Sequence, residues 1–509
     1  MAEHESVRLP AASDLPTAAE RLTRLGFVPA MAVATDERTG PDGDLKLRWV
    51  FEPIAPADDR FVTLVVPVDP SRPEVPSLTP MMPAANWHER EAQDLFGIRF
   101  AGHPDPRTLV LHDGWPAGVF PMRKDFDGRQ QIAAEPAEEF PHLRVEGDGV
   151  FEIPVGPIHA GIIEPGHFRF SSVGEVVLHL DARLFYTHRG LEKRMEGLSP
   201  DQAFYVAERI CGVCSVAHGL GFCEALEQVA GVEAPPRARV LRGVLLELER
   251  LYNHAGDVGN LCAGAAYHYG TSAGLRIKEA LQQLNEHLAG NRFLRGVVVP
   301  GGVALDVTPE LARAVERAVA AAARELRDLV ERIENNASVI DRLDETGVLG
   351  REAVVDLGVT GVAARASGID RDARRDHPHA AFALPSAPRP QVVTEADGDV
   401  HARFQVRARE ALESARLVRE LLSSLPAGPL ATTLPATAGG VGLAAIESPR
   451  GACLHWLRLD GAGRVDRYHL RSASYANWPA VPLAAQAAIV PDFPLVNKSF
   501  ELCYSCTDR

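Results

Sequence analysis

The chain has 509 residues, of which 46% are hydrophobic and 24% are charged, and its formal net charge is −15. This length is enough for two or more domains with buried cores, and the negative charge argues against a nucleic-acid-binding surface. No apolar run reaches the roughly 20 residues of a membrane-spanning helix, and the N-terminal residues show no secretory signal. The seven cysteines are too few for a disulfide scaffold, and we expect the cytosol to keep them reduced.

The first part of the sequence, up to about residue 125, mixes strand patterns with polar turns. Residues 61–67 are mostly apolar, which predicts a buried strand, whereas residues 45–51 alternate between apolar and polar side chains, which predicts a half-exposed strand. Residues 127–149 are polar and acidic and are predicted to be a linker. Further strands are predicted at 150–154 and 173–182.

Helical patterns dominate after residue 190. Thr308, followed by Pro309 and Glu310, is typical of a helix N-terminus with a cap, a proline at the first position and an acidic first turn. Apolar residues then recur every three or four positions and predict one amphipathic helix of a bundle: Leu311, Val315, Val319, Ala322, Leu326, Leu329 and Ile333. Similar stripes predict helices over 236–257, 272–290 and 401–424.

Two pairs of cysteines share the spacing CxxC, namely Cys211 with Cys214 and Cys503 with Cys506. Four thiolates brought together by folding are soft ligands, which select zinc, iron–sulfur clusters, copper(I) or nickel–iron centres. The spacing alone favours a structural zinc site, and Arg209 is a cation that would favour the first thiolates. The remaining cysteines are predicted to be small buried hydrophobic residues: Cys223, Cys262 and Cys453.

The residues around these pairs resemble a known family. Arg209-Ile-Cys211-Gly-Val-Cys214 followed by His218, together with Cys503-Tyr-Ser-Cys506-Thr-Asp-Arg509, resembles the large subunit of nickel–iron hydrogenases, and most closely the membrane-bound, complex I-related branch that includes formate hydrogenlyase. The resemblance implies that Cys211 and Cys503 are terminal nickel ligands. It implies that Cys214 and Cys506 bridge nickel to an iron that carries carbon monoxide and cyanide, with Arg209 and His218 surrounding the ligands.

One position departs from the family pattern. The usual Asp-Pro before the second cysteine pair is Glu501-Leu502 here. Glutamate keeps the negative charge, but leucine lacks the fixed φ of proline. The sequence therefore leaves open whether this change impairs the nickel–iron site.

The loop from Gly156 to Arg169 resembles the N-terminal loop of these large subunits. The resemblance implies that Glu164 passes protons to and from a terminal cysteine, a task for which burial can tune a carboxylate. His167, in the same loop, is predicted to lie around the metal ligands. The alternative interpretation of Glu164 is a solvated loop acid.

Two further motifs match the hydrogenase branch. Residues 187–193 and 361–374 also resemble the 49 kDa-type subunit of complex I, and the resemblance implies that Arg365 overhangs the metal centre. Asp370 would orient this guanidinium; the alternative is an ordinary surface ion pair. Glu447-Ser-Pro449-Arg450-Gly451 resembles the family loop beside the site, which implies that Pro449 and Arg450 lie next to it.

Residues 60–126 resemble the 30 kDa-type subunit of complex I, on the stretches 87–98, 102–107 and 122–126. We therefore expect an α+β fold with three parts. Residues 1–126 form a small α+β domain, residues 127–149 a linker, and residues 150–509 a large, mainly helical hydrogenase-like domain with a short β-region at its start.

The resemblance implies an enzyme that catalyses 2H⁺ + 2e⁻ ⇌ H₂. All four paired cysteines are used by the metal, so the chain holds no iron–sulfur cluster of its own, and electrons leave through a small subunit that carries a [4Fe-4S] cluster. Further implied partners are other iron–sulfur subunits, membrane-arm subunits and a formate dehydrogenase, which place the chain on the cytoplasmic face of the membrane without a span of its own. A further magnesium or iron ion, the direction of turnover, the electron donor and ion pumping stay open.

Two other functions remain as alternatives at this point. The first is a quinone-site subunit of a complex I-like NADH-quinone oxidoreductase without nickel or iron, and the second is a zinc-stabilised assembly subunit. Arg509 matches the family residue after which an endopeptidase removes a C-terminal extension. Since the sequence stops there, we expect maturation without that cleavage.

Overall fold

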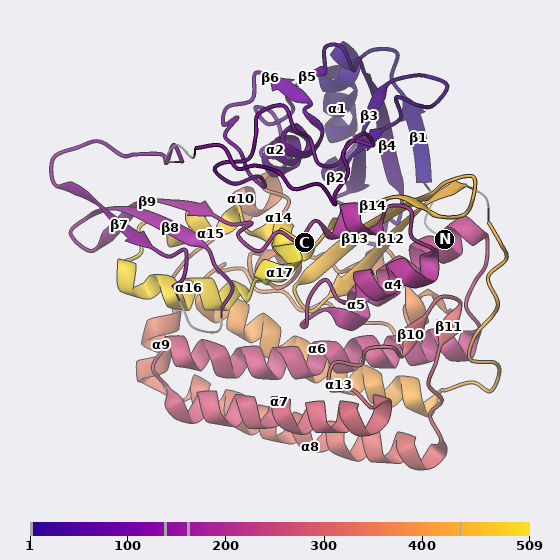
Figure 1. Cartoon of the computed structure of the whole chain (residues 1–509). Coiled ribbons are helices and arrows are strands. Elements are labelled where there is room, and N and C mark those ends of the chain that lie inside the picture. Colours follow the sequence, from indigo (N-terminus) through magenta and orange to yellow (C-terminus); the bar gives the residue numbers. More distant parts are fainter. Residues whose placement is uncertain (1–3, 137–139, 160–162, 438) are drawn as a thin grey trace.

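The computed structural model of the chain describes residues 4–136, 140–159, 163–437 and 439–509. Its N-terminal region is a four-stranded sheet that consists, from edge to edge, of β1 (His4–Arg8), β4 (Phe61–Val68), β3 (Leu45–Pro53) and β2 (Phe27–Asp36) (Figure 1). β1 runs parallel to β4, and the other neighbours are antiparallel. Two helices pack on this sheet, α1 (Leu15–Arg24) and α2 (Ala85–Phe96).

A second sheet, which the sequence analysis did not predict, is formed by residues 440–471. Its strands are antiparallel and follow the chain order: β12 (Gly440–Ser448), β13 (Gly451–Leu459) and β14 (Val465–Arg471). Helix α5 (Ser215–Ala230) packs on it so closely that a Cβ added at Gly221 would lie 2.2 Å from the ring of His455. The mainly helical region expected after residue 190 therefore contains a sheet, and the α+β class is confirmed.

The prediction that β3 is half-exposed was wrong, because β3 is buried along almost its whole length. The strand lies in the middle of its sheet, and the face opposite α1 and α2 is covered by the second sheet, where Val50 belongs to one apolar cluster with Leu454 and Trp456. The polar residues of β3 meet partners in this interface rather than water. Arg48, for example, pairs with Glu37 at 2.7 Å.

The strands predicted at 150–154 and 173–182 are present in a third sheet, made of β7 (Val150–Val155), β8 (His167–Val173) and β9 (Val176–Arg183). Its antiparallel strands extend from one side of the molecule (Figure 1). A short pair, β5 (Glu74–Pro76) with β6 (Arg99–Ala101), precedes it. Between β6 and β7 the described residues, which include most of the predicted linker 127–149, form no helix or strand.

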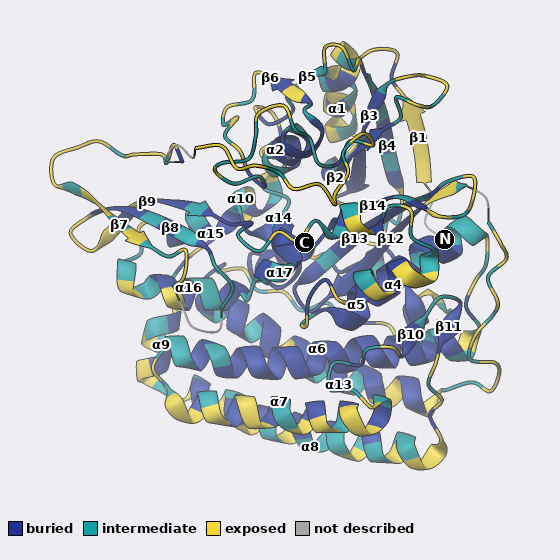
Figure 2. Ribbon diagram, viewed as in Figure 1, coloured by how far each residue is buried: buried dark blue, intermediate teal, exposed yellow. Residues whose placement is uncertain are grey.

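Four long helices form the bundle that the apolar stripes predict: α6 (Pro236–Gly264), α7 (His268–Ala289), α8 (Pro309–Glu334) and α13 (Val400–Ser423). Thr308 caps α8 by accepting a hydrogen bond from the backbone N–H of Leu311 at 3.3 Å. Figure 2 shows that α6 is buried on nearly all sides, whereas α7 and α8 each expose one face. α6 is therefore the central helix of the bundle.

Shorter elements connect these layers: α3 (Leu191–Met195), α4 (Pro200–Glu208), β10 (Val298–Val299), β11 (Gly302–Val303), α9 (Ala337–Leu343), α10 (Arg351–Asp356), α11 (Gly361–Ala366), α12 (Ala373–Asp376), α14 (Ala473–Asn477), α15 (Ala480–Ala485), α16 (Phe493–Phe500) and α17 (Tyr504–Asp508). The C-terminal end lies in the interior of the molecule, between the N-terminal region and the bundle (Figure 1). Among the described residues, no helix combines the length and the apolar character that crossing a membrane requires.

Candidate metal centre

The two cysteine pairs meet in the interior of the protein. The Sγ atoms of Cys211, Cys214 and Cys506 and a ring nitrogen of His218 all lie within 4.8 Å of one another. Cys503 lies beside this cluster, where the thiols of Cys211 and Cys506 act on its pKa. The two cysteine pairs are nearly 300 residues apart in the sequence, and their sulfur atoms together form a donor set for soft metal ions.

The first pair is held in place by the start of α5. Cys214 is the N-cap residue of this helix, and its backbone N–H donates a hydrogen bond to Cys211 Sγ at 3.2 Å. The carboxylate of Glu249, on α6, accepts the next free backbone N–H groups, from Val216 at 2.6 Å and from Ala217 at 3.0 Å. Since the first N–H groups of a helix have no partner within the helix, this carboxylate fixes the turn that carries the two cysteines.

The second pair lies between α16 and α17. Glu501 ends α16 in the left-handed conformation, with φ at +53°, and turns the chain toward Cys503. Arg189 joins the two cysteine segments, because its guanidinium donates to the carbonyl of Ile210 at 2.7 Å and to that of Ser505 at 3.0 Å. One side chain from the predicted 187–193 motif therefore bridges both CxxC turns.

The thiols differ in their electrostatic surroundings. Hydrogen bonds from the thiols of Cys211 and Cys506 lower the pKa of Cys214 to about 7, whereas burial and the neighbouring thiols raise the pKa of Cys506 well above its ordinary value. Burial lowers the pKa of His218 to about 3, so its ring is neutral, with Nε2 3.1 Å from Cys506 Sγ. A cation at this point would favour the thiolate form of all four cysteines, because thiolates are the metal-binding form.

A buried ion pair lies beside the cysteines. The guanidinium of Arg450 pairs with the carboxylate of Asp257, with Nη2 3.0 Å from Oδ1, and its charge acts on Cys214. The carboxylate of Glu501 belongs to the same group and accepts a hydrogen bond from Asn260 at 2.7 Å. Glu501, at the position where the family pattern has aspartate, is thus an acid next to Arg450 and Asp257.

Four polar residues of α6 point toward this centre: Glu249, Asn253, Asp257 and Asn260. Asn253 donates to the carbonyl of Val213, inside the first cysteine turn, at 2.9 Å. The spacing of the four is four, four and three residues, so they lie on one face of α6. Sequence analysis missed them, although polar residues that recur with the helical period inside a buried helix are a signal that could have found them.

The acids that hold Arg365 differ from the predicted one. Its guanidinium is buried among acids, with Nε 2.5 Å from Glu410 and Nη1 2.9 Å from Glu447. Asp370 does not orient it, since this exposed carboxylate pairs with Arg375 at 2.7 Å. Asp370 lies on an exposed loop after α11, whereas the orienting acids come from α13 and β12.

Glu164 lies next to the second cysteine pair. Its carboxylate accepts a hydrogen bond from the hydroxyl of Ser505, one of the two residues between Cys503 and Cys506 in the CxxC turn. Tyr504 in the same turn contacts His159, with its hydroxyl 3.3 Å from Nε2. Residues 160–162 of the predicted loop motif lie outside the described residues.

The remaining predicted residues have other surroundings. His167 packs edge-on against His142, with ring centroids 5.0 Å apart. Arg209 is half exposed and pairs with Glu208 at 2.8 Å. Pro449 lies in the turn that joins β12 to β13 and so precedes Arg450 directly. The three cysteines outside the pairs are buried, as predicted: Cys223, Cys262 and Cys453.

The guanidinium of Arg509 is buried and reaches the N-terminal region. It donates to Glu91, on α2, at 2.8 Å, to Glu192, on α3, at 2.9 Å and to the carbonyl of Leu470 at 2.7 Å. Glu91, Glu192 and His469 also have ligand atoms within 4.8 Å of one another. Because guanidinium groups already occupy these carboxylates, the cluster is an ion-pair network and not a second metal site.

The sequence matches three protein families in chain order. Residues 10–131 match the respiratory-chain NADH dehydrogenase 30 Kd subunit, residues 189–263 the nickel-dependent hydrogenases, and residues 269–439 and 434–509 the respiratory-chain NADH dehydrogenase 49 Kd subunit. Formate hydrogenlyase subunit 5 of Escherichia coli (strain K12) is 35% identical over 88% of this chain and 79% of that relative. The chain belongs to the family of complex I-related nickel–iron hydrogenase large subunits. Hydrogenase-4 component G of the same organism is 33% identical over 95% of this chain and 84% of that relative.

Membership of this family makes the chain an oxidoreductase of the hydrogenase class, in which a part like the 30 kDa subunit of complex I is fused to a part like its 49 kDa subunit. A chain in the structure of the membrane-bound sulfane sulfur reductase, an archaeal respiratory membrane complex, shares the fold, with a TM-score of 0.67 and 24% identity over 71% of this chain and 99% of that chain. The match to nickel-dependent hydrogenases implies a nickel–iron centre, and the cysteine-rich cluster of Cys211, Cys214 and Cys506, with Cys503 beside it, fits this centre.

Proposed function

We propose that the chain is the catalytic large subunit of a membrane-associated hydrogenase and interconverts H₂ with two protons and two electrons. The meeting of Cys211, Cys214 and Cys506 with His218, and the place of Cys503 beside them, carry this proposal. Cys211 and Cys503 would be terminal ligands of nickel, and Cys214 and Cys506 would bridge nickel to an iron with carbon monoxide and cyanide ligands. When bound, this centre supplies the site at which hydrogen is cleaved or formed.

Glu164 is our candidate for moving protons between the cysteines and the outside. It is partly exposed and accepts a hydrogen bond from Ser505, which lies within the second cysteine turn. A carboxylate at the edge of a buried thiol cluster can take a proton from one side and release it on the other. The protonated acid would return the proton when hydrogen is formed.

Arg450, rather than Arg365, is the guanidinium that we place beside the centre. Its charge acts on Cys214, and its pair with Asp257 holds it rigidly. A fixed cation with five donors can bind anionic ligands and stabilise negative charge in a buried cavity. The carboxylate of Asp257 balances the charge of this guanidinium.

We also propose the partners that this chemistry requires. All four paired cysteines bind the nickel–iron centre, so electrons would leave through a small subunit with a [4Fe-4S] cluster. Further iron–sulfur and membrane-arm subunits, and a formate dehydrogenase, would complete a complex on the cytoplasmic face of the membrane. The relatives named above include a formate hydrogenlyase subunit, which supports this assignment.

Metal analysis of the purified complex, combined with infrared spectroscopy, tests the proposal. We expect nickel in the complex, together with infrared bands of metal-bound carbon monoxide and cyanide, all lost in a Cys214→Ser variant. Zinc in place of nickel would indicate the assembly subunit. Absence of both metals would indicate the metal-free quinone-site subunit to which the 49 Kd family match also points.

A further inference from the structure

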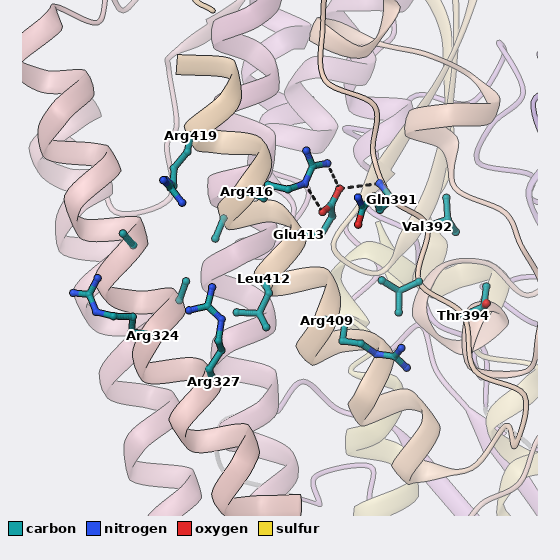
Figure 3. Close-up of a pocket in the computed structure, with 14 residues that line it drawn as sticks. Arg324, Arg327, Gln391, Val392, Thr394, Arg409, Leu412, Glu413, Arg416 and Arg419 are labelled. Atoms are coloured by element: carbon teal, nitrogen blue, oxygen red, sulfur yellow. Dashed lines mark hydrogen bonds and ion pairs between the residues drawn. The ribbon is translucent and has the colours of Figure 1, made fainter. Parts of the chain in front are cut away.

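A groove lined with arginines lies between α8 and α13, on a surface that the metal centre does not use. Figure 3 shows arginine side chains around it. Arg324 and Arg327 come from α8, and Arg409, Arg416 and Arg419 come from α13. Residues 391–394 form the third wall, and the groove encloses about 920 Å³.

The positive charge of the groove is only partly balanced. Glu413 is the single acid among the lining residues, and its carboxylate is already engaged by Arg416 at 2.8 Å and by the backbone N–H of Gln391 at 2.8 Å. Arg409 pairs with Glu395 just outside the lining. Arg324, Arg327 and Arg419 make no ion pair with any residue that the structure describes.

This arrangement brings no advantage for folding. Arg324 and Arg327 are three residues apart on one helix, as are Arg416 and Arg419 on the facing helix. Like charges at this spacing are neighbours on the helix surface and destabilise it slightly. Arg416 is paired with Glu413 and Glu420, but three arginines of the groove have no acidic partner among the described residues, in a chain whose net charge is −15. An anionic ligand that binds there would explain them.

The length of the cluster indicates the kind of anion. The wall of the groove on α13 runs from Arg409, which is paired with Glu395, to the unpaired Arg419, ten residues of helix or about 15 Å. One phosphate or one lipid head group concentrates its charge within a few ångströms, whereas carboxylates spaced along an extended peptide cover this length in about five residues. Guanidinium groups bind carboxylates through two parallel hydrogen bonds, and Leu412, Val392 and Val393 offer apolar contacts between the charges.

We propose that this groove is a docking site for an acidic, extended segment of a partner subunit. The partner presents several aspartate or glutamate side chains along one strand-like segment, which pair with the unpartnered guanidinium groups of α8 and α13. The proposal goes beyond hydrogen chemistry, since it concerns assembly and makes no use of the cysteines. It would stand even if the metal centre had another role.

Binding of a labelled hexaglutamate peptide to the full-length chain, followed by fluorescence anisotropy, tests the charge match. We expect a variant with Arg324→Gln, Arg327→Gln and Arg419→Gln to bind at least tenfold more weakly. The matched control removes three exposed arginines of the N-terminal region: Arg21→Gln, Arg24→Gln and Arg72→Gln. It should bind within twofold of the unmodified chain. Equal losses in both variants, or displacement of the peptide by equimolar tripolyphosphate or by vesicles of anionic lipid, would overturn the proposal.

Cross-linking in the intact complex identifies the occupant. Thr394 lines the groove and is exposed, so a photoreactive amino acid at this position should label an acidic segment of one partner subunit. The label should disappear when the three groove arginines are replaced by glutamine. Labelling of lipid alone, of a segment without acidic residues, or of no partner at all would contradict the proposal.

Discussion

Replacing Glu91 with glutamine should loosen the second cysteine pair, although Glu91 belongs to a helix of the N-terminal region. Its carboxylate receives the buried guanidinium of Arg509 at 2.8 Å, three residues beyond Cys506. The second acid on this guanidinium, Glu192, is shared with Arg467 at 2.7 Å. Two acids thus balance two arginines, and the substitution leaves one positive charge uncompensated in the interior.

The size of the effect follows from the burial of the pair. Removing one partner of a buried ion pair costs about 3–5 kcal/mol. Glutamine still offers an oxygen to Arg509, so we expect the lower limit, about 3 kcal/mol, which corresponds to a roughly hundredfold change in an equilibrium constant. The change should act mainly on the opening of the segment that ends in Arg509, because the guanidinium holds it.

Amide hydrogen exchange of residues 500–509, measured by mass spectrometry, reports this opening. We expect exchange to be about a hundredfold faster in Glu91→Gln, together with faster alkylation of Cys506 in the metal-free chain. Glu20→Gln is the matched control, since Glu20 forms an exposed pair with Arg24 that contributes little. Unchanged exchange in Glu91→Gln, or equal changes in both variants, would refute the reasoning.

Three further outcomes are expected. Cys506→Ser should abolish nickel binding in metal analysis while Cys223→Ser retains it, because only Cys506 faces the other thiols; nickel retained by Cys506→Ser would contradict the site. Glu164→Gln should lower hydrogen turnover by about 10²–10⁴-fold at unchanged nickel content, and unchanged hydrogen–deuterium exchange with solvent would point to another proton route. Burial raises the pKa of Glu89 from 4.5 to about 7, so protonation of this side chain stabilises the folded chain by at most about 3 kcal/mol. This stabilisation is complete below the pKa of the unfolded chain and is lost as the pH rises through the pKa of the folded chain. Glu89→Gln should therefore reduce the fall in Tm between about pH 5 and pH 8, and an unchanged slope would argue against it.

The parts of the fold that local sequence determines were predictable. α8 is an example, since its cap, its proline and its apolar stripe all lie within the helix itself. The second sheet was missed because β12 and β13 are short, mainly apolar runs, which periodicity cannot separate from buried helix, and because β14 is rich in polar residues although it is buried. β3 was assigned an exposed face for a different reason: the surface that covers it comes from residues about 400 positions later in the chain.

The candidate site likewise contains residues that the sequence predicts and residues that it does not. The cysteines could be found because their spacing carries the chemistry in the sequence itself. The carboxylates that hold Arg365 could not be found, since Glu410 and Glu447 approach it only in the folded chain. Asp370 is close to Arg365 in the sequence but pairs with Arg375 instead. Partners of buried charges are set by tertiary packing, and a single sequence does not reveal which of many acids will meet a given arginine.

The distance along the chain between the cysteine pairs gives the centre a second role as a cross-link. A metal bound by Cys211 and Cys506 closes a loop of about 295 residues. By the relation used for disulfides, closing a loop of this length lowers the entropy of the unfolded chain by an amount equivalent to about 5–6 kcal/mol at 25 °C. This is as large as the whole folding stability of many domains. Metal binding would thus stabilise the fold strongly, and the metal-free protein would unfold and be proteolysed more readily than the metal-bound form.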